Sequence, residues 1–382
     1  MKKPQNKGVK ISLKKGLKES ILKTIKDMLH NECFDAVLMP MQVPAKDSYA
    51  WVLIKDKKIL EEANPIAPVM PVQGAKALSS FSRKGETSLN IAALMKPCEI
   101  RAAIELSKLN QINLRNITLI SYDCPGALPL SDYTDNPDNS EKKFKTIIDK
   151  LNFHDDSVKP VCQMCDEFSL IPDCDLHFGF SHNQENFMLL IPQSKRGEQI
   201  IKTMDMKASQ DVSEWNKFIQ EKRKKRQNKR NERFKKLKNM VEGFDTLMDT
   251  FSDCIGCHNC RSACPVCYCR QCYFDSETVI PDSDVLLLKA KKRGGISFPL
   301  DRIMFHVGRM SHMSLSCVSC GLCSDACPVS IPVAEIFSYV ADNTQKDFEY
   351  KSGENKEESV PLMTFRLEEV KGIKKLVENA EG

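Results

Sequence analysis

The sequence lacks any apolar run close to the roughly 20 residues that a membrane-spanning helix needs. No apolar core follows its first residues, Met-Lys-Lys-Pro-Gln, as one would in an export signal. We therefore expect a cytoplasmic protein without a transmembrane segment. The sequence also lacks a G-x-G-x-x-G motif, so a Rossmann-type flavin or nicotinamide site is not supported. Hydrophobic residues, at 41%, are not scarce, which excludes wholesale disorder.

Cysteine is abundant, with 17 cysteines among 382 residues. In a reducing compartment such cysteines are more often metal ligands or redox groups than disulfides. Residues 254–265 and 317–328 share the spacing C-x2-C-x2-C-x3-C-P. This spacing is typical of bacterial ferredoxins, in which three thiolates bind one [4Fe–4S] cluster and the fourth binds the other cluster.

The two segments therefore predict two clusters that exchange one ligand. The first cluster is assigned to Cys254, Cys257, Cys260 and Cys327. The second cluster is assigned to Cys264, Cys317, Cys320 and Cys323. The alternative is a pair of structural zinc sites, but these use two CxxC pairs, which do not match a run of three cysteines followed by Cys-Pro. Because the exchange folds the two segments together, the clusters should lie close enough to pass single electrons.

A strand–helix–strand unit lies farther upstream. Residues 91–95 and 117–122 read as buried strands, and residues 99–109 read as an amphipathic helix between them. Strands joined in this way should be parallel. Cys98 and Cys124 then follow the carboxyl ends of two parallel strands, which is the edge where open α/β sheets bind ligands.

A CxxC pair, Cys162 and Cys165, follows this unit. Together with Cys98 and Cys124 it would supply four thiols for a third [4Fe–4S] cluster. The alternative is two buried cysteines and an unrelated CxxC pair. Spacing alone leaves both interpretations open, because the four cysteines are scattered between residues 98 and 165.

Several sequence blocks resemble a known family. They are Met95-Lys-Pro-Cys-Glu-Ile-Arg-Ala102, Asp123-Cys-Pro-Gly126, Cys162-Gln-Met-Cys-Asp-Glu-Phe168, Cys174-Asp-Leu-His-Phe-Gly179, residues 254–275 and residues 305–332. In this order they look like the beta subunit of coenzyme F420-dependent hydrogenases and formate dehydrogenases, in the form that carries a two-cluster ferredoxin extension.

The resemblance implies FAD in the N-terminal domain, a nearby [4Fe–4S] cluster, and two-electron exchange with a deazaflavin or a related soluble carrier. Matched residue by residue, it makes Cys98, Cys124, Cys162 and Cys165 the ligands of the third cluster. Lys96 and Arg101 lie at the start of the predicted helix, where an anion such as a phosphate would bind. A surface salt bridge is the alternative role for these two cations.

The expected fold class is α+β, in three parts. Residues 1–205 form the α/β flavin and iron–sulfur domain, with a helix over residues 17–29 and further strands at Ala36–Met39, Trp51–Ile54 and Phe187–Ile191. Residues 206–253 form a basic helical connector. Residues 254–382 form a mostly helical, bacterial-ferredoxin-like two-cluster domain with a polar tail, in which residues 351–359 read as an exposed loop.

The connector carries eleven Lys and Arg and two Glu between Glu221 and Asn239. This run is typical either of a nucleic-acid-binding surface or of a solvated linking helix; we favour the helix, because the run has no pattern of interleaved aromatic residues that would support base stacking. Near its end, apolar residues recur at helical spacing and predict one continuous stripe for docking. The stripe comprises Phe234, Leu237, Val241, Phe244, Met248 and Phe251.

These features predict an electron-transfer subunit that connects a two-electron carrier, through FAD, to [4Fe–4S] clusters and a catalytic oxidoreductase partner. The alternative is a flavin-free iron–sulfur relay with no substrate of its own. No residue is assigned to catalysis. Cys267, Cys269 and Cys272 are left over in a dense group, which either binds a further metal with a partner or packs around the first cluster.

Overall fold

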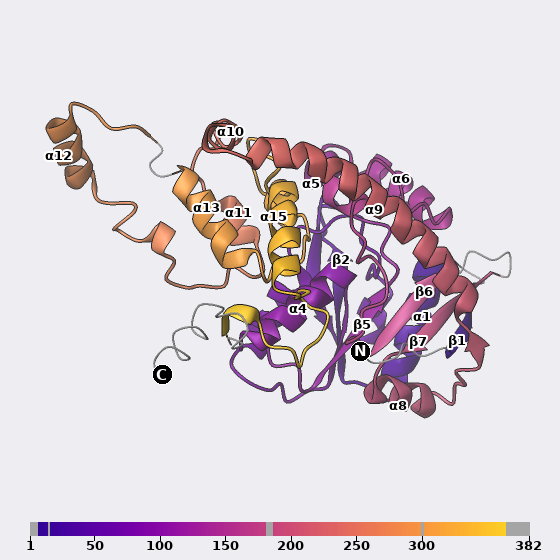
Figure 1. Ribbon diagram of the computed structural model, residues 1–382. Helices are drawn as coiled ribbons and strands as arrows, with labels where there is room; N and C mark the ends of the chain where they lie inside the picture. The colour runs from indigo at the N-terminus through magenta and orange to yellow at the C-terminus, as the bar shows by residue number, and fades with distance from the viewer. Residues whose placement is uncertain (1–6, 14–15, 181–185, 299–301, 364–382) are drawn as a thin grey trace, which may run out of the picture.

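The computed structural model describes residues 7–13, 16–180, 186–298 and 302–363, so the end of the polar tail lies outside it. A mixed eight-stranded sheet occupies the N-terminal half, and a largely helical, cysteine-rich region follows (Figure 1). The strand order is β3-β2-β4-β5-β6-β7-β1-β8. The strands are β1 (Lys7–Ser12), β2 (Ala36–Gln42), β3 (Tyr49–Ile54), β4 (Ile91–Leu94), β5 (Ile117–Tyr122), β6 (Leu176–Phe180), β7 (Phe187–Pro192) and β8 (Gln210–Asp211).

The centre of the sheet is parallel. Strands β2, β4, β5 and β6 run in one direction. On one side β3 pairs antiparallel with β2, and on the other side β7, β1 and β8 each pair antiparallel with the strand before them in the sheet order. Helix α4 (Pro97–Lys108) connects β4 to β5, as the strand–helix–strand prediction requires. The expected unit is therefore confirmed, and the carboxyl ends of β4 and β5 lie at one edge of the sheet.

Side chains alternate between two cores because successive residues of a strand face opposite sides of a sheet. On β4, Ala92 and Leu94 face one core, while Ile91 and Ala93 face the other. Helices α1 (Leu17–His30) and α6 (Pro137–Asp149) and the start of α9 (Ser213–Val241) cover the first face; α3 (Gly74–Ser82) and α4 cover the second. Shorter helices connect these elements: α2 (Lys57–Leu60), α5 (Leu130–Asp135), α7 (Pro160–Gln163) and α8 (Lys195–Thr203).

A buried carboxylate fixes the chain where β5 ends. Asp123 accepts hydrogen bonds from the backbone N–H of Phe180 at 2.7 Å and from the indole N–H of Trp215 at 2.7 Å. His177 Nε2 lies 3.0 Å from the same carboxylate, and the Ser169 hydroxyl also donates to it. The network joins β5, β6 and α9, so it positions Cys124, the next residue along the chain.

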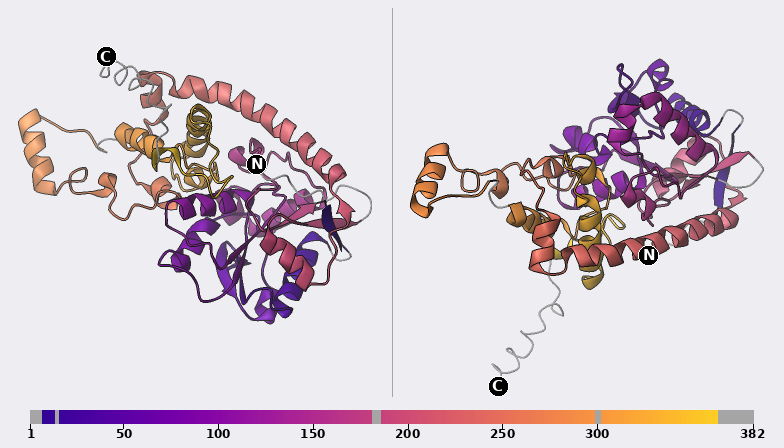
Figure 2. Two further views of the ribbon diagram at one scale, coloured as in Figure 1. Left: turned by 60° about the horizontal axis from the view of Figure 1, so that its bottom comes forward. Right: turned by 90° about the horizontal axis from the view of Figure 1, so that it is seen from above.

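Helix α9 runs along one side of the molecule, from the sheet to the cysteine-rich region (Figures 1 and 2). The predicted apolar stripe does not continue through it as one helix. Gly243, with φ of +102°, separates α9 from α10 (Phe244–Thr250). Phe234, Leu237 and Phe251 are buried, but Phe244 is 71% exposed, so the expectation of a single docking stripe is wrong beyond Val241.

The C-terminal region packs around a third core, to which α9, α13 and α15 contribute. Its elements are α11 (Asn259–Ala263), the 3₁₀ turn η1 (Tyr273–Asp275), α12 (Ser283–Arg293), α13 (Arg302–Met313), α14 (Leu322–Asp325), α15 (Val333–Asp347) and η2 (Pro361–Met363). Within the described parts of the chain, no helix has the length and apolar character needed to cross a membrane.

Replacing Asp123 tests the buried network. Asp123→Ala should lower the free energy of unfolding by about 3 kcal/mol or more, because it leaves several buried donors without an acceptor. The measurement is the urea midpoint, followed by circular dichroism. Asp149→Ala, at an exposed carboxylate near the end of α6, is the control and should shift the midpoint little. Equal midpoints for the two variants would contradict this role of Asp123.

Candidate iron–sulfur site

The first predicted group of cysteines lines one small cavity. Its four thiols are those of Cys254, Cys257, Cys260 and Cys327. Cys254 and Cys257 lie on the loop that leads into α11, Cys260 lies in α11 itself, and Cys327 follows α14. The loop turns tightly, because Gly256 and His258 both have positive φ. This turn lets the backbone N–H of Gly256 approach the sulfur of Cys254 to 3.4 Å. We call this group the distal set.

The second predicted group lines another small cavity. Its thiols are those of Cys264, Cys317, Cys320 and Cys323. The exchange expected from the spacing is therefore present in the fold: Cys264 leaves the loop of the distal set and joins the second group, and Cys327 does the reverse. We call this group the central set.

The third group lies at the predicted edge of the sheet. Cys98 is in the first turn of α4, Cys124 follows β5, and Cys162 and Cys165 lie in and just after α7. Burial raises the pKa of the Cys98 thiol well above its usual value, and nearby charges, including those of Cys124 and Cys165, raise this pKa further. Burial raises the pKa of Cys124 to about 12, with a further contribution from Cys162. These mutual effects place the four thiols together as a proximal set.

The central set lies between the other two. Cys320 of the central set is among the charges that raise the pKa of Cys98 in the proximal set. The loops approach closely here: Gly321 has φ of +85°, and a Cβ on it would stand 2.5 Å from Val161, the neighbour of Cys162. A side chain at this position would clash with Val161 and would strain the backbone, so glycine permits this close approach.

The residues fit iron–sulfur clusters better than single metal ions. Among the described residues, no three His, Cys, Asp or Glu side chains converge as ligands of one ion. The four thiolates of a cubane bind four different irons, so they stand farther apart than zinc ligands do. Each set is an all-sulfur donor set in buried surroundings, where ionised thiols need compensating positive charge.

Three buried cations accompany the cysteine sets, and sequence analysis missed all three. Arg309 on α13 donates to Cys260 Sγ at 3.0 Å in the distal set and also lines the cavity of the central set. Its Nε has no hydrogen-bond partner among the described residues. His306, one turn earlier, places Nε2 3.3 Å from Cys254 Sγ.

The other two cations lie beside the proximal set. Lys159 is 2% exposed and forms an ion pair with Asp325 of α14. Burial lowers its pKa, but Asp325 and the thiols of Cys162 and Cys320 outweigh that effect, so the pKa of Lys159 is raised and the ammonium stays charged between the proximal and central sets.

Arg226 is the third cation and belongs to the basic run of α9. It is 1% exposed and donates to the backbone carbonyls of Phe153 at 2.8 Å, Pro125 at 2.9 Å and Cys165 at 3.3 Å. The guanidinium thus ties together the loops that carry Cys124 and Cys165. Its neighbours Lys224 and Lys225 are exposed, so the sequence carries no signal that would single out Arg226.

Lys96 and Arg101, the residues expected at an anion site, are both buried. Lys96 is the N-cap of α4, and its charge opposes the rise in the pKa of Cys124. Arg101 donates to the backbone oxygen of Ser352 at 2.9 Å and to its hydroxyl at 3.0 Å. The segment 351–359 is therefore not an exposed loop throughout, as expected: Ser352 is fully buried against α4. Within the described part of the chain, neither cation makes the surface salt bridge that was the alternative.

A cavity with a volume of about 820 Å³ adjoins two cysteine sets. Its wall includes Cys165 of the proximal set and Cys317 of the central set, and it lies between α9 and α15. This volume is within the range of about 300–1,000 Å³ that is usual for cofactor and ligand sites. Arg101 is on the wall, as is Arg230, which pairs with Asp166 at 2.6 Å.

The remaining cysteines do not form a further set in the described residues. Cys267 lies within hydrogen-bonding reach of Cys264, and this bond is the main cause that lowers the pKa of Cys264 to about 6. Cys269 is exposed, and Cys272 packs against the third core. This arrangement favours packing around the clusters over a separate metal site.

Comparison with known proteins assigns the chain to a family. It is 31% identical over 276 residues to the F420-dependent formate dehydrogenase subunit beta of Methanocaldococcus jannaschii, which covers 65% of this chain and 69% of that protein. It is 30% identical over 299 residues to the F420-dependent formate dehydrogenase 1 subunit beta of Methanococcus maripaludis, covering 69% and 73%. The chain belongs to this beta-subunit family. As a member it is a subunit of an oxidoreductase, and the suspected resemblance is confirmed.

Two other comparisons add less. No family model matches the chain. A chain of the F420-reducing [NiFe] hydrogenase complex from Methanosarcina barkeri, solved after xenon derivatization, aligns with 61% of the present chain and 93% of its own length, at a TM-score of 0.42 and 13% identity.

Arg226 offers a test of the proximal set. Arg226→Ala should release the loops that carry Cys124 and Cys165, so the purified protein should lose about four irons per chain, the content of one cubane. Anaerobic purification with an iron assay measures this loss. Lys224→Ala, two residues away on the exposed side of α9, is the matched control and should keep all its iron. Full iron content in Arg226→Ala would refute the role of this residue.

Proposed function

We propose that this protein is the electron-transfer subunit of a multi-subunit oxidoreductase. It would pass electrons between a two-electron carrier of the F420 type, through FAD, and [4Fe–4S] clusters that lead to a catalytic partner. Such a partner would be a formate dehydrogenase, a hydrogenase or a heterodisulfide reductase. One observation carries the proposal: three sets of four cysteines lie in series, proximal to central to distal.

The series arrangement supports conduction rather than three independent structural sites. Cys98 and Cys320 are close enough to influence each other's charge, which joins the proximal and central sets. Arg309 contacts Cys260 and lines the central cavity, which joins the central and distal sets. A chain of cubanes accepts electrons one at a time, and hydrogen bonds and nearby charges tune their potentials.

The large cavity is the place we propose for FAD. A flavin, when bound, exchanges the two electrons of a hydride with single-electron acceptors. The cavity reaches Cys165 and Cys317, so its walls would hold the flavin beside both the proximal and the central set. Trp215 and Tyr350 supply aromatic surface, and Arg101 supplies a buried cation at the edge of the site.

The flavin-free relay remains the second candidate, and a specific observation favours it. The cations on the cavity wall already have partners: Arg230 binds Asp166, Lys351 binds Glu167 at 2.7 Å, and Arg101 binds Ser352. A dinucleotide would need some of these cations for its phosphates. The two candidates predict the same clusters and differ only in bound flavin.

The proposed division into residues 1–205, 206–253 and 254–382 is kept, with one addition. Segment 350–354 belongs to the last part but packs on α4, where Tyr350 donates to Glu105 at 2.5 Å. Nucleic acid binding by the connector has little support. Inward-facing cations of the run are paired within the chain, since Arg230 also binds Asp342 and Arg233 binds Glu335.

Iron and flavin counts test the proposal. Protein purified without oxygen should contain about twelve irons, with equal sulfide, and about one FAD per chain. Cys98→Ala should lose about four irons, whereas Cys33→Ala, at a cysteine outside all three sets, should lose none. Clusters without flavin would favour the plain relay. Colourless protein, or protein loaded with zinc, would refute electron transfer altogether.

Arg309 should set the potentials of the clusters beside it. A buried cation stabilises the reduced, more negative state of a cluster, so Arg309→Met should make the distal and central clusters harder to reduce. In a redox titration followed by electron paramagnetic resonance, the reduced-to-oxidised ratio at a fixed potential should fall about tenfold, equivalent to about 59 mV for one electron. Arg309→Lys keeps the charge and should stay close to the wild type. Unchanged potentials in Arg309→Met would contradict this role.

A further inference from the structure

A segment beside the distal set projects away from the rest of the molecule. It spans residues 276–298 and includes α12, which stands clear of the other elements in every view (Figures 1 and 2). None of its residues is buried. We call it the arm.

The arm is nevertheless rich in apolar residues. Leu287 and Leu288 are 67% and 66% exposed, and Ile280 and Phe298 are 58% and 65% exposed. Exposed apolar side chains that gather in one place mark interaction sites rather than ordinary surface. A helix that buries nothing gains nothing from packing, so in this chain alone α12 has little to stabilise it.

The apolar residues of α12 are typical of a helix that a protein encloses. Val285, Leu286, Leu287 and Leu288 are consecutive, and at 3.6 residues per turn they point to nearly all sides of the helix. A helix that lies on a membrane has one apolar face and one polar face. Residues 285–288 form one turn of α12 that is apolar on nearly all sides, and apolar surface of this kind is typical of a segment that another protein covers. The second half of α12 carries Lys289, Lys291, Lys292 and Arg293, which calls for an acidic rim on the partner.

Both roots of the arm are fixed to the distal set. Asp275, the residue before the arm, lies 2.7 Å from His258 Nδ1 and pairs with Arg261 at 2.6 Å; both partners lie among the cysteines of the distal set. Beyond the arm, α13 carries His306 and Arg309, which contact Cys254 and Cys260.

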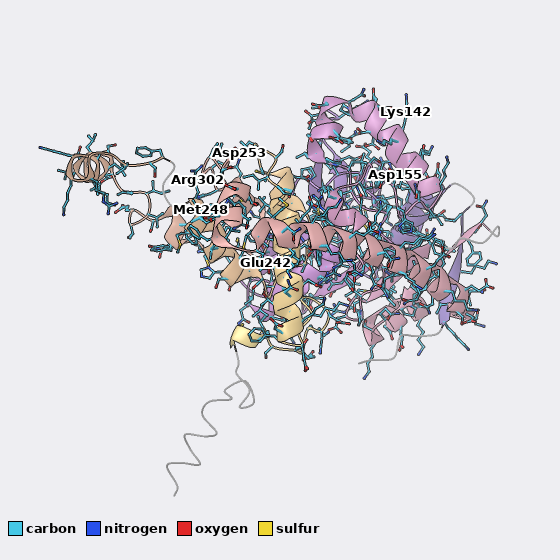
Figure 3. The ribbon with its side chains drawn as sticks, turned by 45° about the horizontal axis from the view of Figure 1, so that its top comes forward. Lys142, Asp155, Glu242, Met248, Asp253 and Arg302 are labelled. Atoms are coloured by element: carbon cyan, nitrogen blue, oxygen red, sulfur yellow. The ribbon has the colours of Figure 1, made fainter. Side chains whose placement is uncertain are left out.

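The surface around these roots is also suited to electron exchange. Cys257 is exposed, and Ile255 beside it is 55% exposed. Met248, which is 41% exposed, lies with Asp253 and Arg302 at the end of the molecule from which the arm projects (Figure 3).

We propose that the arm is the docking element for the catalytic subunit that exchanges electrons with the distal cluster. That subunit would enclose α12 in an apolar groove with an acidic rim and would come to rest over Cys257. The proposal rests on the proposed function, which says that such a subunit exists. It adds where that subunit binds and through which residues.

The test is co-expression of the full chain with a tagged catalytic subunit of formate dehydrogenase from the organism that encodes this chain. Leu287→Asp/Leu288→Asp should reduce co-elution on anaerobic size exclusion at least tenfold. Leu53→Asp, at another exposed leucine on β3, is the control and should co-elute like the wild type. Hydrogen–deuterium exchange of residues 276–298 should be fast in the free chain and slow in the complex.

Iron content and reduction by a viologen dye separate failure of this proposal from failure of the proposed function. The iron content and the reduction by the dye should be unchanged in the double variant. If the wild-type chain contained no iron, the proposed function would be refuted instead. Undiminished co-elution of the double variant, or a cluster-loaded wild type that does not co-elute, would overturn the docking role. The docking role would also be overturned if the double substitution only abolished a homodimer of this chain, or only abolished its binding to anionic phospholipid vesicles.

Discussion

Buried sulfur needs buried positive charge, and the arrangement of this molecule follows from that requirement. Twelve thiols gather in three sets, and burial raises the pKa of many of them, as at Cys98 and Cys124. Each of the two junctions between the sets holds a cation: Arg309 lies between the distal and central sets, and Lys159 lies between the central and proximal sets. A third cation, Arg226, lies beside the cysteines of the proximal set. These cations compensate the negative charge of the ionised cysteines. They also hold together the loops that carry these cysteines.

The same cations explain why the N-terminal sheet and the cysteine-rich region form one molecule. Lys159, just before α7, pairs with Asp325 of α14, so this buried ion pair joins the two parts. Breaking such a pair leaves an uncompensated buried charge, which costs about 3–5 kcal/mol. Arg101 and Ser352 make a second link, and the close approach of Gly321 to Val161 makes a third. Three independent contacts around one junction restrict the distance between the proximal and central sets.

Local sequence patterns were enough to predict the central strand–helix–strand unit and to predict which cysteines line each of the two small cavities. The strand–helix–strand unit followed from apolar runs of the right length, and the exchange of Cys264 and Cys327 followed from the ferredoxin spacing. The cations were beyond reach for a physical reason: Arg226 is one of eleven basic residues in its run, and only tertiary packing decides which of them turns inward. The stripe failed after Val241 because helical spacing can continue across a break, and Gly243 ends the helix there. Ser352 lies in a charged stretch, so its burial depended on a distant partner, Arg101.

Helix α9 connects these observations. Its 29 residues span about 43 Å at about 1.5 Å per residue, and within it Trp215 in the sheet core and Leu237 in the core beside the distal set are about 33 Å apart. A long helix that is mostly solvated gains little stability from its sequence alone, so it depends on tertiary contacts. Here it is held by Trp215 at one end, by Arg226 and Arg230 in the middle and by Phe234, which stacks edge-on to Tyr339 at 5.4 Å between ring centroids, near the other. The density of charge that first suggested nucleic acid therefore serves a structural end: the outward-facing residues keep the helix solvated, and Arg226 and Arg230 fasten it to the loops that carry Cys124 and Cys165 and to α15.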